Sequence, residues 1–235
     1  MSRFPAVPTP SRLPTGTIEP TAQRTTFTGV IGALCMRPLR AIINLCVALR
    51  IHPNTLTLIG YLINVAAAFA LGYGHFIWAG VIIVSANIFD MIDGKVAHEL
   101  QLQSQFGAFW DSTLDRLSDL ALLSGLIFLY SKLGRSDYVL VAVLALIFSI
   151  MTSYARARAE SLIQKCKVGF MERPERIVLF MIGAFTDRMA AVLWVILILS
   201  VVAVADRIYY TYLALNTLPM PSHQGVGGVF KRAFF

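Results

Sequence analysis

The sequence has few charged residues, and this shortage limits the class of protein to which it belongs. Asp, Glu, Lys and Arg make up only 14% of its 235 residues, whereas hydrophobic residues make up 57%. A soluble domain averages roughly 45 to 50% apolar residues. The composition therefore excludes an ordinary soluble protein and predicts one that is embedded in a membrane.

Cysteine and several common functional motifs are also scarce or missing. The three cysteines, Cys35, Cys46 and Cys166, are odd in number and lack the spacing of metal ligands, so we interpret them as apolar filler. The sequence contains no Gly-rich phosphate loop, internal repeat or nucleic-acid-binding module. Its net charge of +7 is explained by membrane topology and anionic lipid, and we expect no nucleic-acid partner.

The N-terminal region divides into two parts. Residues 1–26 are rich in Pro, Ser and Thr without apolar periodicity, which predicts a disordered extension, and they lack the apolar core of a signal peptide. Residues 27–52 carry Arg37, Arg40 and Arg50 among apolar side chains, which predicts an amphipathic helix lying in the membrane interface. Pro38 is expected to bend this helix or to begin it.

The rest of the chain predicts an all-α, polytopic membrane protein. A helix needs about 20 apolar residues to cross the hydrocarbon layer, and residues 53–215 are expected to form a six-helix domain followed by a tail over 216–235. Asn54 or Thr55 is expected to cap the first helix. The predicted spans, of which the fifth is short, are 54–73, 76–97, 108–131, 137–159, 174–187 and 189–210.

The distribution of basic residues predicts the orientation of these spans. If the N-terminus is cytoplasmic, only Lys132, Arg135 and Arg188 lie on the opposite side of the membrane. This sorting agrees with the positive-inside tendency. We therefore expect a multi-pass protein of the cell (inner) membrane with both ends, and the site described next, facing the cytoplasm.

Four aspartates interrupt the apolar helical sequence in a fixed pattern. It reads D-x-x-D-G-x-x-A, nine residues, G-x-x-x-D-x-x-x-D, and its members are Asp90, Asp93, Gly94, Ala97, Gly107, Asp111 and Asp115. Residues three or four apart share one face of a helix. The polar segment 99–106 is expected to be the turn between two antiparallel helices, which would bring all four carboxylates together.

Clustered carboxylates in a membrane protein indicate a functional site, and a bound cation is their natural counter-charge. Oxygen ligands favour a hard cation, Mg²⁺ first and Mn²⁺ next, rather than zinc. Two such ions roughly 3.5 to 4 Å apart are the usual clamp for phosphoryl displacement. Gly94 and Gly107 lack a Cβ, so a ligand or helix can approach the backbone closely there.

This pattern resembles the signature of the CDP-alcohol phosphatidyltransferases, D-x-x-D-G-x-x-A-R, eight residues, G-x-x-x-D-x-x-x-D. The match is complete except that His98 stands where the family has Arg. The resemblance implies that the four aspartates hold two Mg²⁺ ions and that Asp115 is the base that activates the acceptor hydroxyl. It also implies a set of contacts to the nucleotide of the CDP-lipid, namely Asn54, Thr57, Gly94, Ala97, His98, Ser104 and Gly107. Ser104 is equally well explained as a turn residue.

A second, basic constellation follows the fourth predicted span. The stretch SYARARAESLIQKCKVGFMERPERI contains four arginines, Arg156, Arg158, Arg173 and Arg176. Guanidinium groups grip phosphate bidentately, although such residues also anchor helices at lipid phosphates, which is the interpretation favoured for Lys165 and Lys167. Glu160, Glu172 and Glu175 could pair with some of the arginines.

The segments SYARARAE, MERPER and GAFWDSTLDRLSD are similar to the branch of the family that makes phosphatidylinositol phosphate in bacteria, or its archaeal counterpart. The resemblance covers roughly residues 30 to 210 and implies that the four arginines lie near the phosphate of inositol 1-phosphate. The expected reaction is transfer of a phosphatidyl group from CDP-diacylglycerol, or an ether-linked CDP-lipid, to this polyol phosphate with release of CMP. The resemblance also implies a homodimer.

Other functions remain open from the sequence. The same chemistry could serve glycerol 3-phosphate, inositol or serine as the acceptor. A divalent cation transporter could also line its path with intramembrane carboxylates, although it would need neither Gly107 nor a basic patch. A prenyltransferase of the UbiA type would be expected to carry two separated aspartate motifs and more spans.

Overall fold

The computed structural model describes residues 40–163, 166 and 168–217, and every regular element among them is a helix. The chain divides into two compact units, Met1–Ala41 and Ile42–Phe235, and the description below concerns the second. The predicted disordered extension over 1–26, the first part of the predicted interfacial helix and residues 218–235 of the predicted tail lie outside the described residues. Residues 40–48 are helical.

Helices occupy all six ranges in which spans were predicted. Their bounds are α2 (Pro53–Gly72), α3 (Phe76–Glu99), α4 (Gln105–Lys132), α5 (Ser136–Glu160), α6 (Arg173–Phe185) and α7 (Met189–Thr217). The predicted turn over 99–106 is therefore confirmed as the connection between α3 and α4. Helix α7 continues two residues beyond the predicted domain boundary at 215.

The helix starts that border the site are fixed by local sequence. The cap of α2 is His52, whose Nδ1 accepts a hydrogen bond from the Asn54 backbone N–H at 3.2 Å, so the expectation of a cap at Asn54 or Thr55 was wrong. Pro53 explains the difference, because its fixed φ and missing N–H suit the first helical position, which makes the preceding residue, His52, the cap. Helix α4 is capped by Ser104, whose Oγ accepts from the Gly107 backbone N–H at 2.9 Å.

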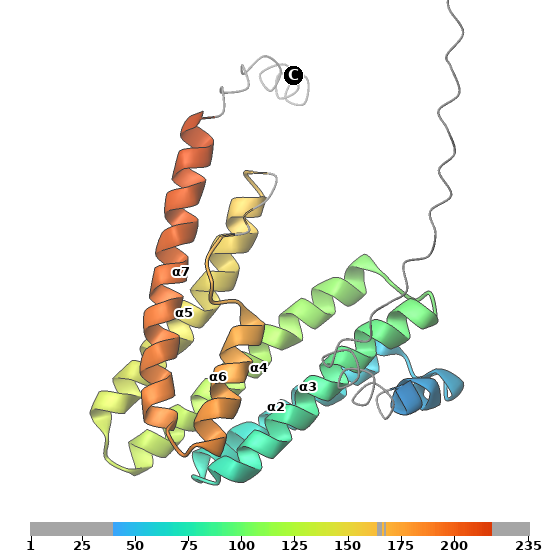
Figure 1. The fold of residues 1–235 in the computed structure, drawn as a ribbon, viewed down its shortest axis with the longest axis horizontal. Coiled ribbons are helices and arrows are strands. Elements are labelled where there is room, and N and C mark those ends of the chain that lie inside the picture. The colour runs from blue at the N-terminus through green and yellow to red at the C-terminus, as the bar shows by residue number, and fades with distance from the viewer. Residues whose placement is uncertain (1–39, 164–165, 167, 218–235) are drawn as a thin grey trace, which may run out of the picture. The chain divides into compact units, whose positions relative to one another are not determined.

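The six helices alternate in direction. In Figure 1 the helices α3, α5 and α7 begin at the end where α2, α4 and α6 finish, so the short connections at 73–75, 133–135 and 186–188 share one end of the domain. Buried apolar side chains from all six helices form a common core, with Leu71, Ile83 and Leu122 among its members. Helices α2 and α4 pack so closely that a Cβ on Gly125 would lie 2.2 Å from the Ala68 carbonyl oxygen.

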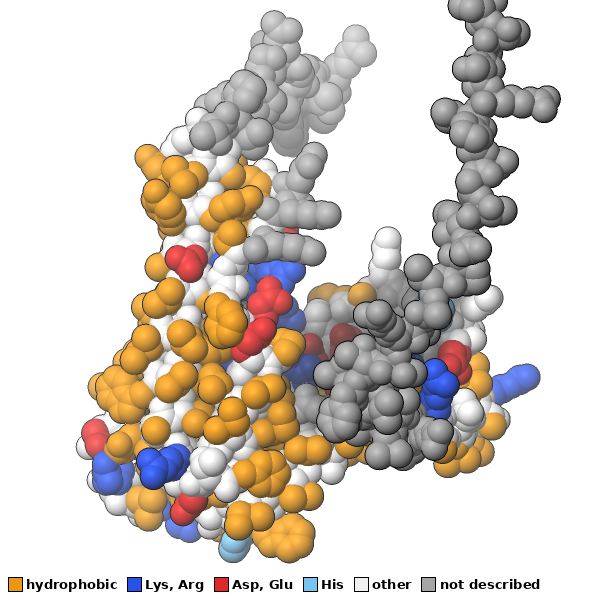
Figure 2. Space-filling model, viewed as in Figure 1, with side chains coloured by type: hydrophobic (Ala, Val, Ile, Leu, Met, Phe, Trp, Pro, Cys, Tyr) orange, Lys and Arg blue, Asp and Glu red, His pale blue; other side chains and the backbone are white. Residues whose placement is uncertain are grey.

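Within the described part of the chain, four helices are long and apolar enough to cross a membrane: α2, α3, α5 and the Met189–Asn216 part of α7. Helix α7 also carries exposed apolar side chains such as Trp194, Ile198 and Val202, and hydrophobic side chains cover its visible face in Figure 2. These properties are consistent with a membrane protein. Helix α4 is long but contains the charged motif, and α6 has only 13 residues.

Candidate active site

Three of the four motif aspartates form a compact acidic cluster. Asp90 and Asp93 project from α3 and Asp111 from α4, and each offers a carboxylate oxygen within 4.8 Å of the others. The helical spacing explains this arrangement, because Asp90 and Asp93 lie on one face of α3 that packs near the start of α4. The cluster predicted from the sequence is therefore present for these three residues.

A cavity of about 200 Å³ adjoins this cluster; we call it the acidic cavity. It contains six of the seven residues predicted to contact the nucleotide, whereas His98 lies exposed in the last turn of α3 and is not part of the lining. The cavity is lined by Pro53, Asn54, Thr57, Asp93, Gly94, Ala97, Leu102, Gln103, Ser104, Gly107, Ala108 and Asp111.

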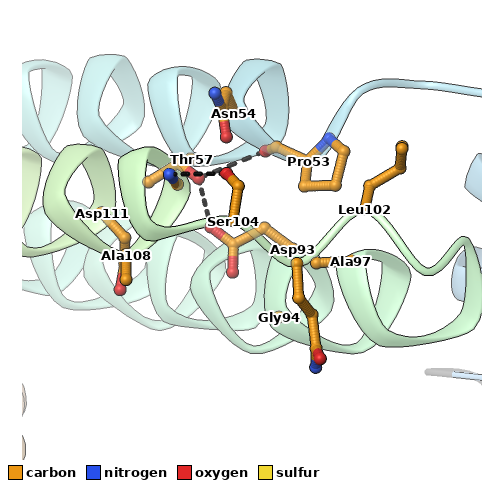
Figure 3. Close-up of a pocket in the computed structure, with 12 residues that line it drawn as sticks. Pro53, Asn54, Thr57, Asp93, Gly94, Ala97, Leu102, Ser104, Ala108 and Asp111 are labelled. Atoms are coloured by element: carbon orange, nitrogen blue, oxygen red, sulfur yellow. Dashed lines mark hydrogen bonds between the residues drawn. The ribbon is translucent and has the colours of Figure 1, made fainter.

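Asp93 is oriented by a threonine on the neighbouring helix. The Thr57 Oγ1 donates to Asp93 Oδ2 at 2.6 Å and also lies 3.2 Å from the Pro53 carbonyl oxygen, as the dashed lines in Figure 3 show. Both side chains are buried, with Asp93 only 7% exposed. The hydrogen bond fixes the carboxylate in one orientation, which is the function of groups that surround metal ligands.

The two motif glycines leave room at the mouth of this cavity. A Cβ on Gly107 would lie 3.1 Å from the Ser104 Oγ and 3.4 Å from the Asn54 Oδ1, whereas a Cβ on Gly94 would meet nothing within 4 Å. Gly107 therefore allows the close approach of α2 and the start of α4, and Gly94 leaves an open backbone surface. The Trp110 Nε1–H also ties α4 to α2 by donating to the Asn54 carbonyl oxygen at 3.3 Å.

The donor set of the acidic cluster suits a hard divalent cation. Its members offer only carboxylate oxygens, which Mg²⁺ and Mn²⁺ prefer over softer nitrogen or sulfur ligands. The fit is chemical as well as geometric, because three carboxylates this close together repel one another unless a cation lies among them. The cluster could hold a metal ion.

A second cavity, of about 150 Å³, lies beside the first and is bounded by α4, α5, α6 and α7; we call it the basic cavity. Three of the four predicted arginines, Arg156, Arg173 and Arg176, contribute to it. Arg158 instead lines a separate groove with Tyr154 and Tyr212. The basic cavity is lined by Asp115, Arg116, Asp119, Thr152, Ser153, Arg156, Met171, Glu172, Arg173, Pro174, Arg176 and Arg207.

Arg173 connects the basic cavity to the acidic cluster. Its Nη1 lies 2.8 Å from Asp90 Oδ2 and 2.8 Å from Asp115 Oδ1. The structure thus places the fourth motif aspartate against a guanidinium, one turn further along α4 than Asp111. The sequence predicted both Arg173 and the aspartates as site residues but not their direct contact.

The other arginines of the basic cavity are also paired. Arg176 is 2% exposed and donates from Nη2 to Asp119 Oδ2 at 2.7 Å and from Nη1 to Thr152 Oγ1 at 3.0 Å. Arg156 contacts Glu172 at 2.6 Å and Glu160 at 3.2 Å. The predicted pairing of arginines with Glu160 and Glu172 is thereby confirmed.

Glu175 behaves differently from the other two glutamates. Its Oε2 accepts from the Glu172 backbone N–H at 3.0 Å, as part of a capping box at the start of α6. A glutamate at this position of a helix satisfies a backbone donor that would otherwise lack a partner.

Sequence reasoning missed three residues of this cavity: Asp119, Thr152 and Arg207. Asp119 follows Asp115 by one helical turn, so its spacing was a usable signal. Thr152 and Arg207 carried none, because they come from α5 and α7 and meet only in the folded protein, where Arg207 donates to the Thr152 carbonyl oxygen and, at 3.0 Å, to that of Val168.

Comparison with known proteins identifies the family of this chain. Residues 50–205 match the family model of the CDP-alcohol phosphatidyltransferases. The chain is 36% identical to an archaetidylinositol phosphate synthase of Pyrococcus horikoshii over 74% of this chain and 90% of that protein. It is 32% identical to a phosphatidylinositol phosphate synthase of Mycobacteroides abscessus, over 71% and 78% of the two chains.

Solved structures of the Mycobacterium tuberculosis phosphatidylinositol phosphate synthase share the fold. The structure with CDP-DAG bound matches with a TM-score of 0.70 and 27% identity, covering 75% of this chain and 94% of that one. The structure in complex with manganese and citrate also has a TM-score of 0.70 and 27% identity, over 74% and 88% of the two chains. On this evidence the chain belongs to the CDP-alcohol phosphatidyltransferase family and is a membrane-associated phosphatidyltransferase.

Proposed function

We propose that this enzyme transfers the phosphatidyl group of CDP-diacylglycerol to inositol 1-phosphate, giving phosphatidylinositol phosphate and CMP. The observation that carries the proposal is the contact that Arg173 of the basic cavity makes with Asp90 of the acidic cluster. A donor diphosphate and an acceptor phosphate are both anionic, so each needs positive charge, which cations held by the carboxylates would supply to the first and arginines to the second. The names of the similar proteins, and the CDP-DAG in one of the solved structures, support the same assignment.

The acidic cavity would bind the nucleotide end of the CDP-lipid. Asn54 and Ser104 offer polar side chains at its wall, and Gly94 leaves its backbone open to a ligand. Asp90, Asp93, Asp111 and Asp115 would hold two Mg²⁺ ions, with Mn²⁺ as a possible substitute, and the manganese complex of a similar enzyme supports this. When bound, such ions neutralise charge on the diphosphate and on the leaving CMP.

Asp115 would be the base of the reaction. Its Oδ1 accepts from Arg173, so Oδ2 is the oxygen we assign to receive the proton of the attacking hydroxyl. As that O–H bond breaks, the acceptor oxygen bonds to the lipid-linked phosphorus, and the bond from phosphorus to the CMP oxygen breaks. Before the acceptor binds, Arg173 holds the carboxylate in place from the side of the basic cavity.

The basic cavity would bind the acceptor phosphate through Arg156, Arg173 and Arg176. The Nε atoms of Arg173 and Arg176 are buried and have no hydrogen-bond partner among the described residues. A buried donor without a partner costs about 1 to 3 kcal/mol, and a phosphate oxygen would remove this cost once the guanidinium turns toward the cavity. This supports a phosphorylated acceptor over inositol or serine, and it leaves Arg158, in its separate groove, outside the acceptor set.

We propose six membrane crossings, and the direction of the helices supports this number. Helices α3, α5 and α7 are long enough to span and all start at the same end (Figure 1), so the chain has to return across the membrane between them. Helix α4 has 28 residues, which at about 1.5 Å each exceeds the hydrocarbon thickness of about 30 Å. Helix α6 is shorter, so we propose that it crosses the membrane together with the segment before it.

We propose further that both ends and the two cavities face the cytoplasm and that the enzyme lies in the cell membrane. Lys132, Arg135 and Arg188 lie at the opposite end of the helices, which supports this orientation by the positive-inside tendency. In a background without the native cysteines, a cysteine at Ser161 should react with a reagent on the cytoplasmic side, and one at Ser136 with a reagent outside. A homodimer is proposed from family resemblance alone.

The test is product identification with purified protein and Mg²⁺. CDP-diacylglycerol, and in parallel an ether-linked CDP-lipid, is incubated with inositol 1-phosphate, glycerol 3-phosphate, inositol or serine, and CMP release and lipid mass are measured. We expect CMP and phosphatidylinositol phosphate with inositol 1-phosphate. A product with another acceptor alone would overturn the acceptor assignment, and divalent-cation uptake into proteoliposomes without CMP release would overturn the reaction itself.

A further inference from the structure

Arg173 lies between the aspartates and the basic cavity of the proposed site. Its Nη1 holds Asp90 of α3 and Asp115 of α4 at 2.8 Å each, and its side chain lines the basic cavity. The side chain is only 18% exposed, and its buried Nε has no partner among the described residues. A single guanidinium therefore stands between the carboxylates and the space proposed for the acceptor phosphate.

The backbone that carries Arg173 is fixed. Arg173 is the first residue of α6, the preceding Glu172 is its N-cap, and Glu175 closes the capping box. Pro174 restricts the backbone further, and Glu172 is itself held by Arg156 at 2.6 Å. Any change in the pairing of Arg173 is consequently a change of side-chain rotamer within reach of both cavities.

The charges of the two ligands act on Arg173 in opposite ways. A divalent cation at Asp90 and Asp115 competes with the guanidinium for their oxygens and is repelled by it. An acceptor phosphate attracts the guanidinium, for which bidentate contact with phosphate is a strong alternative to carboxylate. Moving the guanidinium toward a phosphate thus leaves the carboxylates to the cation.

We propose that Arg173 is a positioning residue that couples the two sites, so that an acceptor phosphate and a divalent cation each strengthen the binding of the other. The proposal rests on the proposed function, since it takes the four aspartates as cation ligands and the basic cavity as the acceptor site. Because coupling between two ligands is reciprocal, it can be measured from the cation alone. The coupling also means that the affinity for the cation depends on Arg173 even when no reaction takes place.

The experiment measures Mn²⁺ binding to the purified full-length protein in detergent by the electron paramagnetic resonance signal of unbound Mn²⁺. Wild type is compared with Arg173→Met, with Arg173→Lys and with the matched control Arg156→Met. The control removes the same charge from the same cavity but from a residue that pairs with Glu160 and Glu172. Thermal unfolding of each variant checks that it is folded.

Without acceptor, we expect Arg173→Met to bind Mn²⁺ about tenfold more tightly, because a charge a few ångströms from the cation is removed. Arg156→Met should stay within about twofold of wild type, and Arg173→Lys, which keeps the charge, should resemble wild type. Inositol 1-phosphate should tighten Mn²⁺ binding to wild type by about fivefold, within the usual range of coupling. It should have no such effect on Arg173→Met, and neutral inositol none on either.

Three results would each overturn the coupling. The first is that Arg173→Met binds Mn²⁺ no more tightly than wild type, and the second is that Arg156→Met binds Mn²⁺ as tightly as Arg173→Met does. The third is that inositol 1-phosphate changes Mn²⁺ affinity equally in wild type and in Arg173→Met. A failure of the proposed function would look different. It would appear as absent CMP release from wild type, whereas the comparison of Mn²⁺ affinities without acceptor does not depend on the identity of the acceptor.

Discussion

The acidic and basic cavities lie side by side, yet the chain assembles them in different ways. The acidic cluster comes from one motif on the consecutive helices α3 and α4. The basic cavity draws on four helices, and its buried pair of Arg176 and Asp119 joins residues 57 positions apart. Helical spacing aligns Asp90 with Asp93, and the packing of α3 and α4 against α2 brings Asp111 to them, whereas the second arrangement depends on how more distant helices pack.

The two cavities also differ in how their charges are balanced. Each arginine of the basic cavity that was predicted to bind phosphate already contacts a carboxylate, as Arg156 contacts Glu172 and Arg176 contacts Asp119. In the acidic cluster three carboxylates face one another, and only Asp90 is reached by an arginine. The acidic cluster therefore depends on an added cation, while these arginines of the basic cavity already have carboxylate partners within the protein.

Removing an acidic ligand should have the largest effect on catalysis. Asp111→Asn keeps the side-chain shape but lowers the charge of the cluster, and we expect turnover to fall about 10³-fold, equivalent to the several kcal/mol that metal-ion catalysis supplies. CMP release from CDP-diacylglycerol measures this. Ser112→Ala is the control, because the Ser112 hydroxyl only donates to the Phe109 carbonyl oxygen and should be dispensable. Normal turnover of Asp111→Asn would contradict the role of the cluster.

A substitution at Asp115, which lines the basic cavity and contacts Arg173, tests the assignment of the base. Asp115→Asn should lower kcat by about 10²- to 10⁴-fold, the usual contribution of a general base, while the KM for the CDP-lipid changes much less. Steady-state kinetics with saturating Mg²⁺ separate the two constants. If the purified variant kept full turnover, the base would have to be another group.

The buried pair of Arg176 and Asp119 in the basic cavity should affect stability. Arg176→Met leaves Asp119 buried without its partner and should cost about 3 to 5 kcal/mol of unfolding free energy, measured by unfolding in detergent. The double variant Arg176→Met/Asp119→Leu removes both charges and should recover most of this loss. A double variant as unstable as the single one would mean that the pair itself, rather than the unpaired charge, governs stability.

Substitutions at two glycines compare the effect of close helix packing on stability with the effect of ligand access on KM. Gly125→Ala places a Cβ against the Ala68 carbonyl oxygen and should destabilise the protein by about 1 to 3 kcal/mol, as overpacking does. Gly94→Ala meets no neighbour within 4 Å, so its unfolding should resemble wild type while its KM for the CDP-lipid rises. The reverse pattern would exclude Gly94 from the nucleotide site.

The smallest effect is expected at His98, which departs from the family signature. It lies outside the lining of the acidic cavity, but a charge in the last turn of α3 still acts on a nearby diphosphate. Arginine carries a permanent charge and a planar fork of donors that suits a diphosphate, so His98→Arg should lower the KM for the CDP-lipid slightly. Equal KM values for wild type and variant would show that this position has no electrostatic role.

Much of the site was predictable where the information was local. The helices, the turn between α3 and α4, and the convergence of Asp90, Asp93 and Asp111 follow from apolar runs and from spacing along a helix. The cap of α2 was predicted wrongly because Pro53 moved the helix start to an unexpected residue, His52. The separation of Arg158 from Arg156 was not visible either, although two residues on a helix differ by about 200° in direction.

The sequence by itself determined that this protein is helical and apolar and that it carries four carboxylates on two consecutive helices, because each of these properties depends on residues close together in the chain. Only the tertiary structure decided that Arg173 meets Asp90 and Asp115, that Arg176 is buried against Asp119, and that Arg158 lies in another groove. These contacts depend on how α6 packs among its neighbours, and the periodicity of a single helix carries no information about that packing.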